Sequence, residues 1–139
     1  MFIFTPNTLI ESAKVNANFD EVVDRFNLLE ASGSYSIDEI KTGYKWIDGK
    51  DIYKKTYSTG ALPNATTVTV AHNLTGISQF IDIKGLSYSA TTSIPLPFVS
   101  TTAANCVMIY EASGNIVISA GIDRRAFATT YITLWYTRT

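Results

Sequence analysis

The sequence predicts a mainly β protein, in which an antiparallel β-sandwich or jelly-roll-like knob follows one N-terminal helix. Three observations support this fold class. A helical pattern is confined to Thr8–Glu30. The stretch Thr56–Tyr110 has Asp82 and Lys84 as its only charges and sixteen serine or threonine residues, a composition typical of strands and turns. Toward the C-terminus, apolar and polar residues alternate with a period of two.

The helix begins at Thr8, where Thr8-Leu9-Ile10-Glu11 fits a capping box, and no proline or glycine follows until Gly33. Its apolar residues are spaced four, three, four and three, which is a heptad pattern. They are Val15, Phe19, Val22, Phe26 and Leu29. An isolated helix of this length is marginal in water, so the stripe needs a surface to bury against. Two partners stay open: the chain's own β domain, or the same helix in neighbouring chains.

The first hairpin is expected at Tyr44–Tyr53, with Asp48-Gly49 supplying the positive φ angles of a two-residue turn. This turn would place Tyr44 opposite Tyr53. Ile94–Phe98 contains two prolines, which exclude it from a central strand and predict an apolar loop that covers an edge or meets a partner. Further strands are expected at Thr66–Ala71, Gln79–Leu86, Cys106–Glu111, Asn115–Ala120 and Thr130–Thr137, with Ala112-Ser113-Gly114 joining Cys106–Glu111 to Asn115–Ala120.

The small-residue linker Ala31–Ser34 divides the chain into a helical part, residues 1–33, and a β-sandwich knob, residues 34–139. Three large apolar residues, Phe2, Ile3 and Phe4, precede Pro6 and lie outside the capped helix. A short apolar leader is costly to expose, so it is expected to be buried against another protein.

Composition excludes several classes. The net charge of −1 disfavours bulk nucleic-acid binding, because no basic excess is available to neutralise phosphates. The single cysteine, Cys106, and the single histidine, His72, exclude an internal disulfide and a zinc site. No signal peptide or bilayer-length apolar run is present, so synthesis in a cytoplasm without membrane insertion is expected. No cofactor is indicated.

Candidate catalytic residues have simpler structural interpretations. His72 lacks an accompanying nucleophile motif and is expected to form structural hydrogen bonds. Asp48 and Asp51 could serve glycoside hydrolysis as a carboxylate pair, but Asp48 is also what a tight turn requires. The cluster Asp123-Arg124-Arg125 could bind an anionic sugar or phosphate, or could form an ion pair that fixes a loop.

Two kinds of binding surface are also conceivable. Lys50, Lys54 and Lys55 beside Tyr53 and Tyr57 could follow a nucleic-acid backbone, although a solvated strand face is the simpler interpretation. Aromatic residues make up 12% of the chain. Exposed rings can stack on sugars, and the candidates for such a platform are Tyr57, Tyr88 and Trp135, with core or subunit-interface packing as the alternative.

Two stretches resemble bacteriophage tail and fibre proteins. Val15-Asn16-Ala17-Asn18-Phe19 is similar to the V-N-x-N-F core that opens a short trimeric helix in many of them. Trp46-Ile47-Asp48-Gly49-Lys50-Asp51-Ile52-Tyr53-Lys54-Lys55-Thr56 resembles a β domain found in phage structural proteins. The resemblance extends to Thr5–Thr8, Ala13-Lys14, Gly60–Asn64 and Val70–Asn73, so that it touches about 30 of the 139 residues. The resemblance implies a homotrimeric virion component with a stalk and a distal knob, made in the cytoplasm of a bacterial host.

The functional hypothesis is therefore a non-enzymatic phage fibre, spike or tail-tip protein whose knob decorates the virion or contacts the host surface. On this hypothesis Val15, Phe19, Val22, Phe26 and Leu29 form the trimer seam, and Phe2, Ile3 and Phe4 anchor the chain to other virion proteins. The host partner could be a glycan or a protein, and no receptor-binding residues are identified. The alternatives are a small carbohydrate-active enzyme using Asp51, Asp82 or Asp123, and a carbohydrate-binding module.

Overall fold

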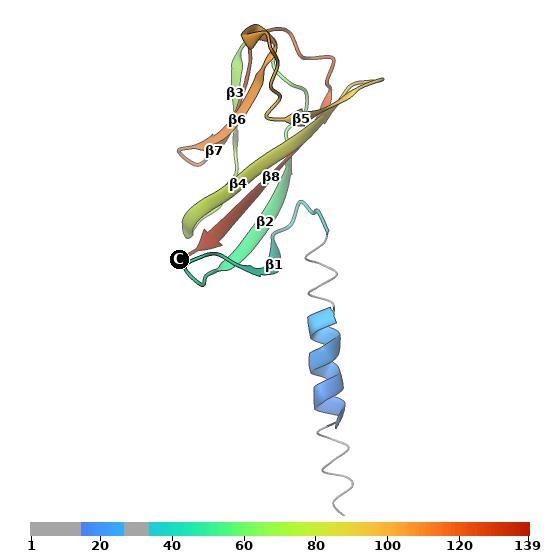
Figure 1. Ribbon diagram of the computed structural model, residues 1–139, viewed down its shortest axis with the longest axis vertical. Coiled ribbons are helices and arrows are strands. Elements are labelled where there is room, and N and C mark those ends of the chain that lie inside the picture. Colours follow the sequence, from blue (N-terminus) through green and yellow to red (C-terminus); the bar gives the residue numbers. More distant parts are fainter. Residues whose placement is uncertain (1–14, 27–33) are drawn as a thin grey trace, which may run out of the picture.

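The computed structural model describes residues 15–26 and 34–139, which form one helix and eight strands (Figure 1). The helix comprises residues 15–26, inside the segment that the capping box and heptad predict. All strand pairs are antiparallel. The strands are β1 (Ile40–Lys45), β2 (Asp51–Ser58), β3 (Thr67–Ala71), β4 (Ile77–Tyr88), β5 (Ser93–Leu96), β6 (Val107–Ala112), β7 (Asn115–Ala120) and β8 (Thr129–Arg138), with a 3-10 turn at Ala103–Asn105.

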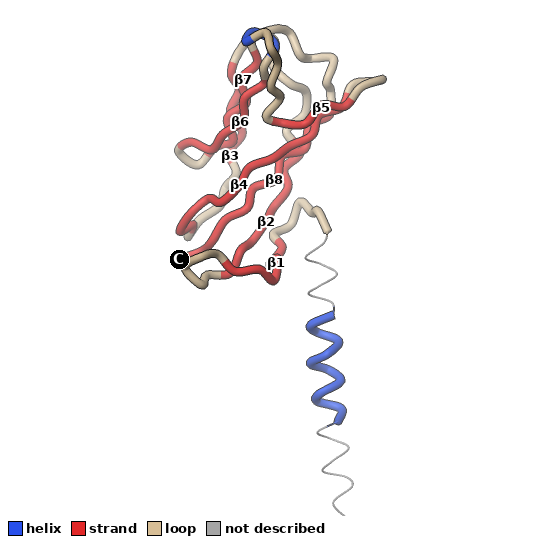
Figure 2. Tube along the Cα trace, in the orientation of Figure 1, coloured by secondary structure: helices blue, strands red, loops and turns tan. Residues whose placement is uncertain are grey.

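The strands are arranged in two sheets (Figure 2). A five-stranded sheet has the order β1-β2-β8-β4-β5, and a three-stranded sheet has the order β3-β7-β6. The last strand, β8, is thus central in the larger sheet and pairs with β2 on one side and β4 on the other. Since successive side chains of a strand point to opposite faces, β8 contributes one row of residues to each face of this sheet.

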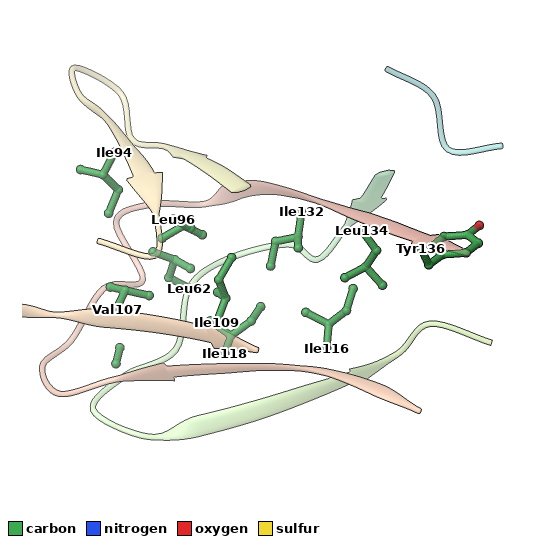
Figure 3. Packing of buried hydrophobic residues seen from close by; sticks show 11 residues of the cluster. Leu62, Ile94, Leu96, Val107, Ile109, Ile116, Ile118, Ile132, Leu134 and Tyr136 are labelled. Carbon is green, nitrogen blue, oxygen red and sulfur yellow. The ribbon is translucent and has the colours of Figure 1, made fainter. Parts of the chain in front are cut away.

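The hydrophobic core lies between the two sheets (Figure 3). Ile132, Leu134 and Tyr136 form the inward row of β8 and have no exposed surface. They face side chains from the smaller sheet, including Ile116 and Ile118 of β7. The mainly β fold with two antiparallel sheets, predicted from the alternating pattern, is confirmed.

The first hairpin differs from its predicted form. Gly49 has a φ of 81°, but Asp48 is not among the positive-φ residues, so this is not the expected two-residue turn. Gly49 N–H donates to Trp46 O, and Trp46 N–H donates to Lys50 O. The register pairs Lys45 with Asp51 and Lys41 with Tyr53, so the predicted pairing of Tyr44 with Tyr53 is wrong.

The two-residue turn occurs instead between β6 and β7. Ala112 pairs with Asn115, and the two residues between them, Ser113 and Gly114, have φ angles of 52° and 83°. Positive φ at both central residues is what a type I′ hairpin turn requires. The predicted join at Ala112-Ser113-Gly114 is therefore confirmed.

The proline-containing segment Ile94–Phe98 is only partly a loop. Ser93–Leu96 forms β5, which pairs with β4 at the outer edge of the larger sheet. Pro95 is tolerated there because an edge strand needs only one row of backbone hydrogen bonds. The five other predicted strands are all observed, with ends that shift by at most two residues.

Candidate functional site: an aromatic groove on the outer sheet face

The candidate site is a groove on the face of the five-stranded sheet that points away from the core. Tyr131, Thr133 and Trp135 form the outward row of β8, opposite in direction to the buried Ile132 and Leu134. Thr133 pairs with Thr56 of β2 and with Lys84 of β4. The groove has a volume of about 640 Å³, which is within the usual range for a ligand site. Its lining residues are Tyr35, Ser36, Ile37, Thr56, Lys84, Gly85, Leu86, Tyr88, Tyr131, Thr133 and Trp135.

One wall is formed by the segment that enters β1. Thr56 N–H donates to Ser36 O at 2.9 Å, which holds this segment against β2. The Tyr35 ring lies edge-on to Trp135, with centroids 6.5 Å apart and an interplanar angle of 89°. Tyr35 is nevertheless 68% exposed, so its ring is available to a ligand.

The floor of the groove is polar at its centre. The hydroxyls of Thr56 and Thr133 are hydrogen-bonded at 2.8 Å and both side chains are buried. On either side along β8 lie Tyr131 and Trp135, about 13 Å apart for four residues of extended chain. The groove therefore presents mainly aromatic and aliphatic surface, with Ile37 and Leu86 among the exposed lining residues, around a pair of largely buried threonine hydroxyls.

Two lysines accompany these rings. Lys84 Nζ lies 5.9 Å from the Trp135 ring centroid and pairs with Asp82 at 3.0 Å. Lys54, a neighbour of Trp135 in the sheet, places its Nζ 4.7 Å from the Tyr35 ring centroid. Burial lowers the pKa of the Lys54 ammonium group. Lys84 is the one charged residue among those that line the groove, and Asp82 balances it.

The structure brings together two of the three aromatic residues proposed from the sequence. Tyr88 and Trp135 both line the groove. Tyr57 faces the other way, and its phenol donates to the backbone oxygen of His72 at 2.8 Å. Burial, together with the charge of Glu39, raises the pKa of Tyr57 to about 12. The sequence interpretation missed Tyr35 and Tyr131, although Tyr131 belongs to the same alternating pattern as Trp135.

The candidate nucleic-acid track does not form a common surface. Lys54 lies on the outer face of β2, whereas the neighbouring Lys55 points to the inner face, with its Nζ 5.3 Å from the Tyr57 ring centroid. Lys50 donates to Ser78 Oγ at 2.7 Å.

His72 has a structural role in the described part of the chain. It is 3% exposed, and its Nδ1 accepts a hydrogen bond from Leu74 N–H. The imidazole is therefore protonated on Nε2, which lies 3.3 Å from Glu111 Oε1. Glu111 also accepts from Gly114 N–H, so this group connects two turns of the fold.

Apart from Asp48, which lies in the turn between β1 and β2 and accepts a hydrogen bond from Lys50 N–H, the carboxylates proposed for hydrolysis lie on different elements. Asp51 at the start of β2 pairs with Lys41 and Lys45. Asp82 pairs with Lys84 on β4, and Asp123 follows β7. Hydrogen bonds from the neighbouring arginine, Arg125, lower the pKa of Asp123 to about 2. Among residues 15–26 and 34–139, no cluster of three His, Cys, Asp or Glu side chains could hold a metal ion.

The Asp123-Arg124-Arg125 cluster matches its simpler interpretation. Arg125 forms two side-chain hydrogen bonds with Asp123, as a local ion pair. Arg124 donates to Asn105 O, and its guanidinium lies near the rings of Phe98 and Phe127. These contacts fix the loop between β7 and β8.

Four of the five residues proposed for the trimer seam lie in the described helix, and their side chains are exposed in the single chain. Val15, Phe19, Val22 and Phe26 are 50%, 66%, 61% and 60% exposed. Leu29 and the proposed anchor Phe2, Ile3 and Phe4 lie outside the described residues.

Comparison with protein families, curated proteins and solved structures finds no match to this chain. No helix within the described ranges is both long and apolar enough to cross a bilayer.

Proposed function

We propose that this chain is a homotrimeric structural component of a bacteriophage virion, a fibre, spike or tail-tip protein with a helical stalk and a jelly-roll-like knob. The knob, residues 34–139, decorates the virion or attaches it to the host surface. The leader Phe2, Ile3 and Phe4 anchors it to other virion proteins.

The observation that carries this proposal is the unpartnered stripe on the helix. Four apolar residues at heptad spacing each leave half or more of their side chain exposed. Heptad residues are typical of helices that pack on copies of themselves, and burial of a phenylalanine contributes about 1.5 to 3 kcal/mol. The alternative of packing on the chain's own β domain predicts low exposure of these side chains, which is not observed among the described residues.

A sandwich knob is suited to attachment. β8 pairs with β2 and β4 at the centre of the larger sheet, so the outer face of this sheet is a rigid surface on which to position binding residues. The apolar side chains on that face are unusual for an isolated surface and indicate a partner.

Multi-angle light scattering of the full chain tests the proposal. A mass near three times the chain mass of 15.3 kDa is expected, and a mass of one chain would contradict the trimer. Antibodies against the knob should also label purified phage particles.

A carbohydrate-active enzyme is the main alternative. It predicts release of reducing ends from bacterial polysaccharide, with loss of activity on Asp51→Asn, Asp82→Asn or Asp123→Asn. We expect no turnover, since each of these carboxylates is paired with a basic residue on its own hairpin or loop. Turnover that one of these substitutions abolishes would overturn the structural proposal.

A further inference from the structure

We propose that the groove on the outer face of the five-stranded sheet is an oligosaccharide-binding site. The inference deepens the proposed function, because it names the class of host-surface ligand that the knob would hold.

The walls have the chemistry that sugar rings require. The C–H groups on one face of a pyranose ring carry a slight positive charge, which the negative face of an indole or phenol ring attracts. Tyr131 and Tyr88 are 43% and 41% exposed, and Tyr35 is 68% exposed. Together with Trp135 they provide ring surface at both ends of the groove, so more than one sugar unit can stack.

Side chains of the groove can also form hydrogen bonds with the hydroxyl groups of the same ligand. Each threonine hydroxyl can donate one hydrogen bond and accept two, and the Thr56–Thr133 bond uses only part of this capacity. Ser36 adds a third hydroxyl to the lining, and Lys84 adds an ammonium donor. The site thus combines a mainly apolar surface with a small number of hydrogen-bonding groups, a combination typical of ligand pockets.

The charge of the groove is also compatible with an oligosaccharide ligand. The ion pair with Asp82 balances Lys84, the one charged residue of the lining, which suits a polyhydroxyl ligand better than a polyanion such as nucleic acid.

The first test is binding of the full chain to an array of bacterial capsule and O-antigen oligosaccharides. The chain has two tryptophans, so Trp46→Phe leaves Trp135 as the single tryptophan, whose emission can be excited selectively over that of the tyrosines. Titration of this variant with an oligosaccharide bound on the array should change the Trp135 emission. No binding on the array, or binding without a change in Trp135 emission, would overturn the inference.

Substitutions then locate the site. Tyr131→Ala and Tyr88→Ala should each weaken binding about tenfold, by loss of one stacked ring. Tyr110→Ala is the matched control, because Tyr110 is 47% exposed but lies on β6 in the smaller sheet, and it should bind like the wild type. Equal affinity of all three variants would contradict the proposed site. Circular dichroism confirms that each variant is folded.

The same samples separate this inference from the proposed function. A trimer that is present on particles but binds no oligosaccharide overturns the groove alone. A monomer that binds oligosaccharide overturns the trimer and leaves the groove. If Tyr131→Ala lowers the oligomeric mass, the groove is a subunit interface and the inference is wrong.

Discussion

Tyr136 donates its phenol hydrogen to the carboxylate of Glu39, a residue far away in the sequence. The Tyr136 ring is fully buried in the core, whereas Glu39 directly precedes β1 and also pairs with Arg138. One carboxylate therefore connects the entry to the first strand with the end of the last strand.

This contact predicts an acid-sensitive contribution to stability. Burial opposes ionisation of Glu39, but hydrogen bonds from Arg138 and Tyr136 outweigh it and hold the pKa below its ordinary value of 4.5. The folded carboxyl thus binds a proton less tightly than the unfolded one, so unfolding takes up a proton and acid favours it. The stabilisation is present above pH 4.5 and is lost as the pH falls through the lowered pKa of the folded state.

Glu39→Gln should lower the free energy of unfolding by about 1 to 2 kcal/mol at neutral pH. The difference from the wild type should shrink as the pH falls below 4.5. Denaturant titrations across this range measure it, with Asp38→Asn as the control that removes the adjacent carboxylate. A difference that stays constant with pH would show that the lost contact is not ionic.

The turn between β6 and β7 predicts a stabilising substitution. Ser113 holds a φ of 52°, which asparagine adopts more readily than serine. Ser113→Asn should stabilise the knob by about 0.5 kcal/mol and raise its Tm by about 2 to 4 °C. Asp48→Asn is the control, since Asp48 is not among the positive-φ residues, and calorimetry should find no gain there.

The stalk proposal predicts opposite outcomes for two helix substitutions. Phe19→Asp would place three like charges around one axis and should convert the trimer into monomers with less helix. Ala17→Asp introduces the same charge two residues away, off the heptad stripe, and should leave the trimer intact. Sedimentation and circular dichroism measure both properties. A Phe19→Asp protein that keeps its mass and helicity would exclude Phe19 from the seam.

The anchor proposal predicts a loss of incorporation without a loss of assembly. Deletion of Phe2–Phe4 should give a trimer that is absent from purified particles, because three leaders acting together gain affinity through their effective concentration. Quantitative immunoblotting of phage measures the copy number. Normal copy number would refute the anchor, and a monomeric product would assign the leader to the trimer core instead.

Local sequence patterns predicted most of the fold, because strand alternation and turn residues act within a few positions. Thr129–Arg138 is the clearest case, since its alternation follows directly from its two contrasting faces. The Asp48-Gly49 pair led to a wrong prediction of the turn, because a glycine at positive φ occurs in more than one type of hairpin turn. The neighbouring residues determine which type forms. β5 was missed because its proline, Pro95, is permitted only by the position of the strand at the sheet edge.

The groove could be predicted only in part. Tyr88 and Trp135 were identifiable as aromatic candidates, but their proximity depends on the placement of β8 beside β4. Tyr35 directly follows the predicted linker Ala31–Ser34, and its ring lies beside Trp135 in a segment that Ser36 holds to β2 by a backbone hydrogen bond. Such contacts depend on sheet order, which local patterns do not specify.

The central position of β8 has a consequence for synthesis. β2 and β4 pair with β8 and not with each other. The larger sheet therefore cannot be completed until residues 129–138 have left the ribosome. Pairings between distant segments also form slowly. Until then, the apolar faces of the earlier strands are open to chaperones and to neighbouring nascent chains. A polypeptide terminated before β8 would lack the strand that joins both halves of the sheet, and it would become a substrate for cellular proteases.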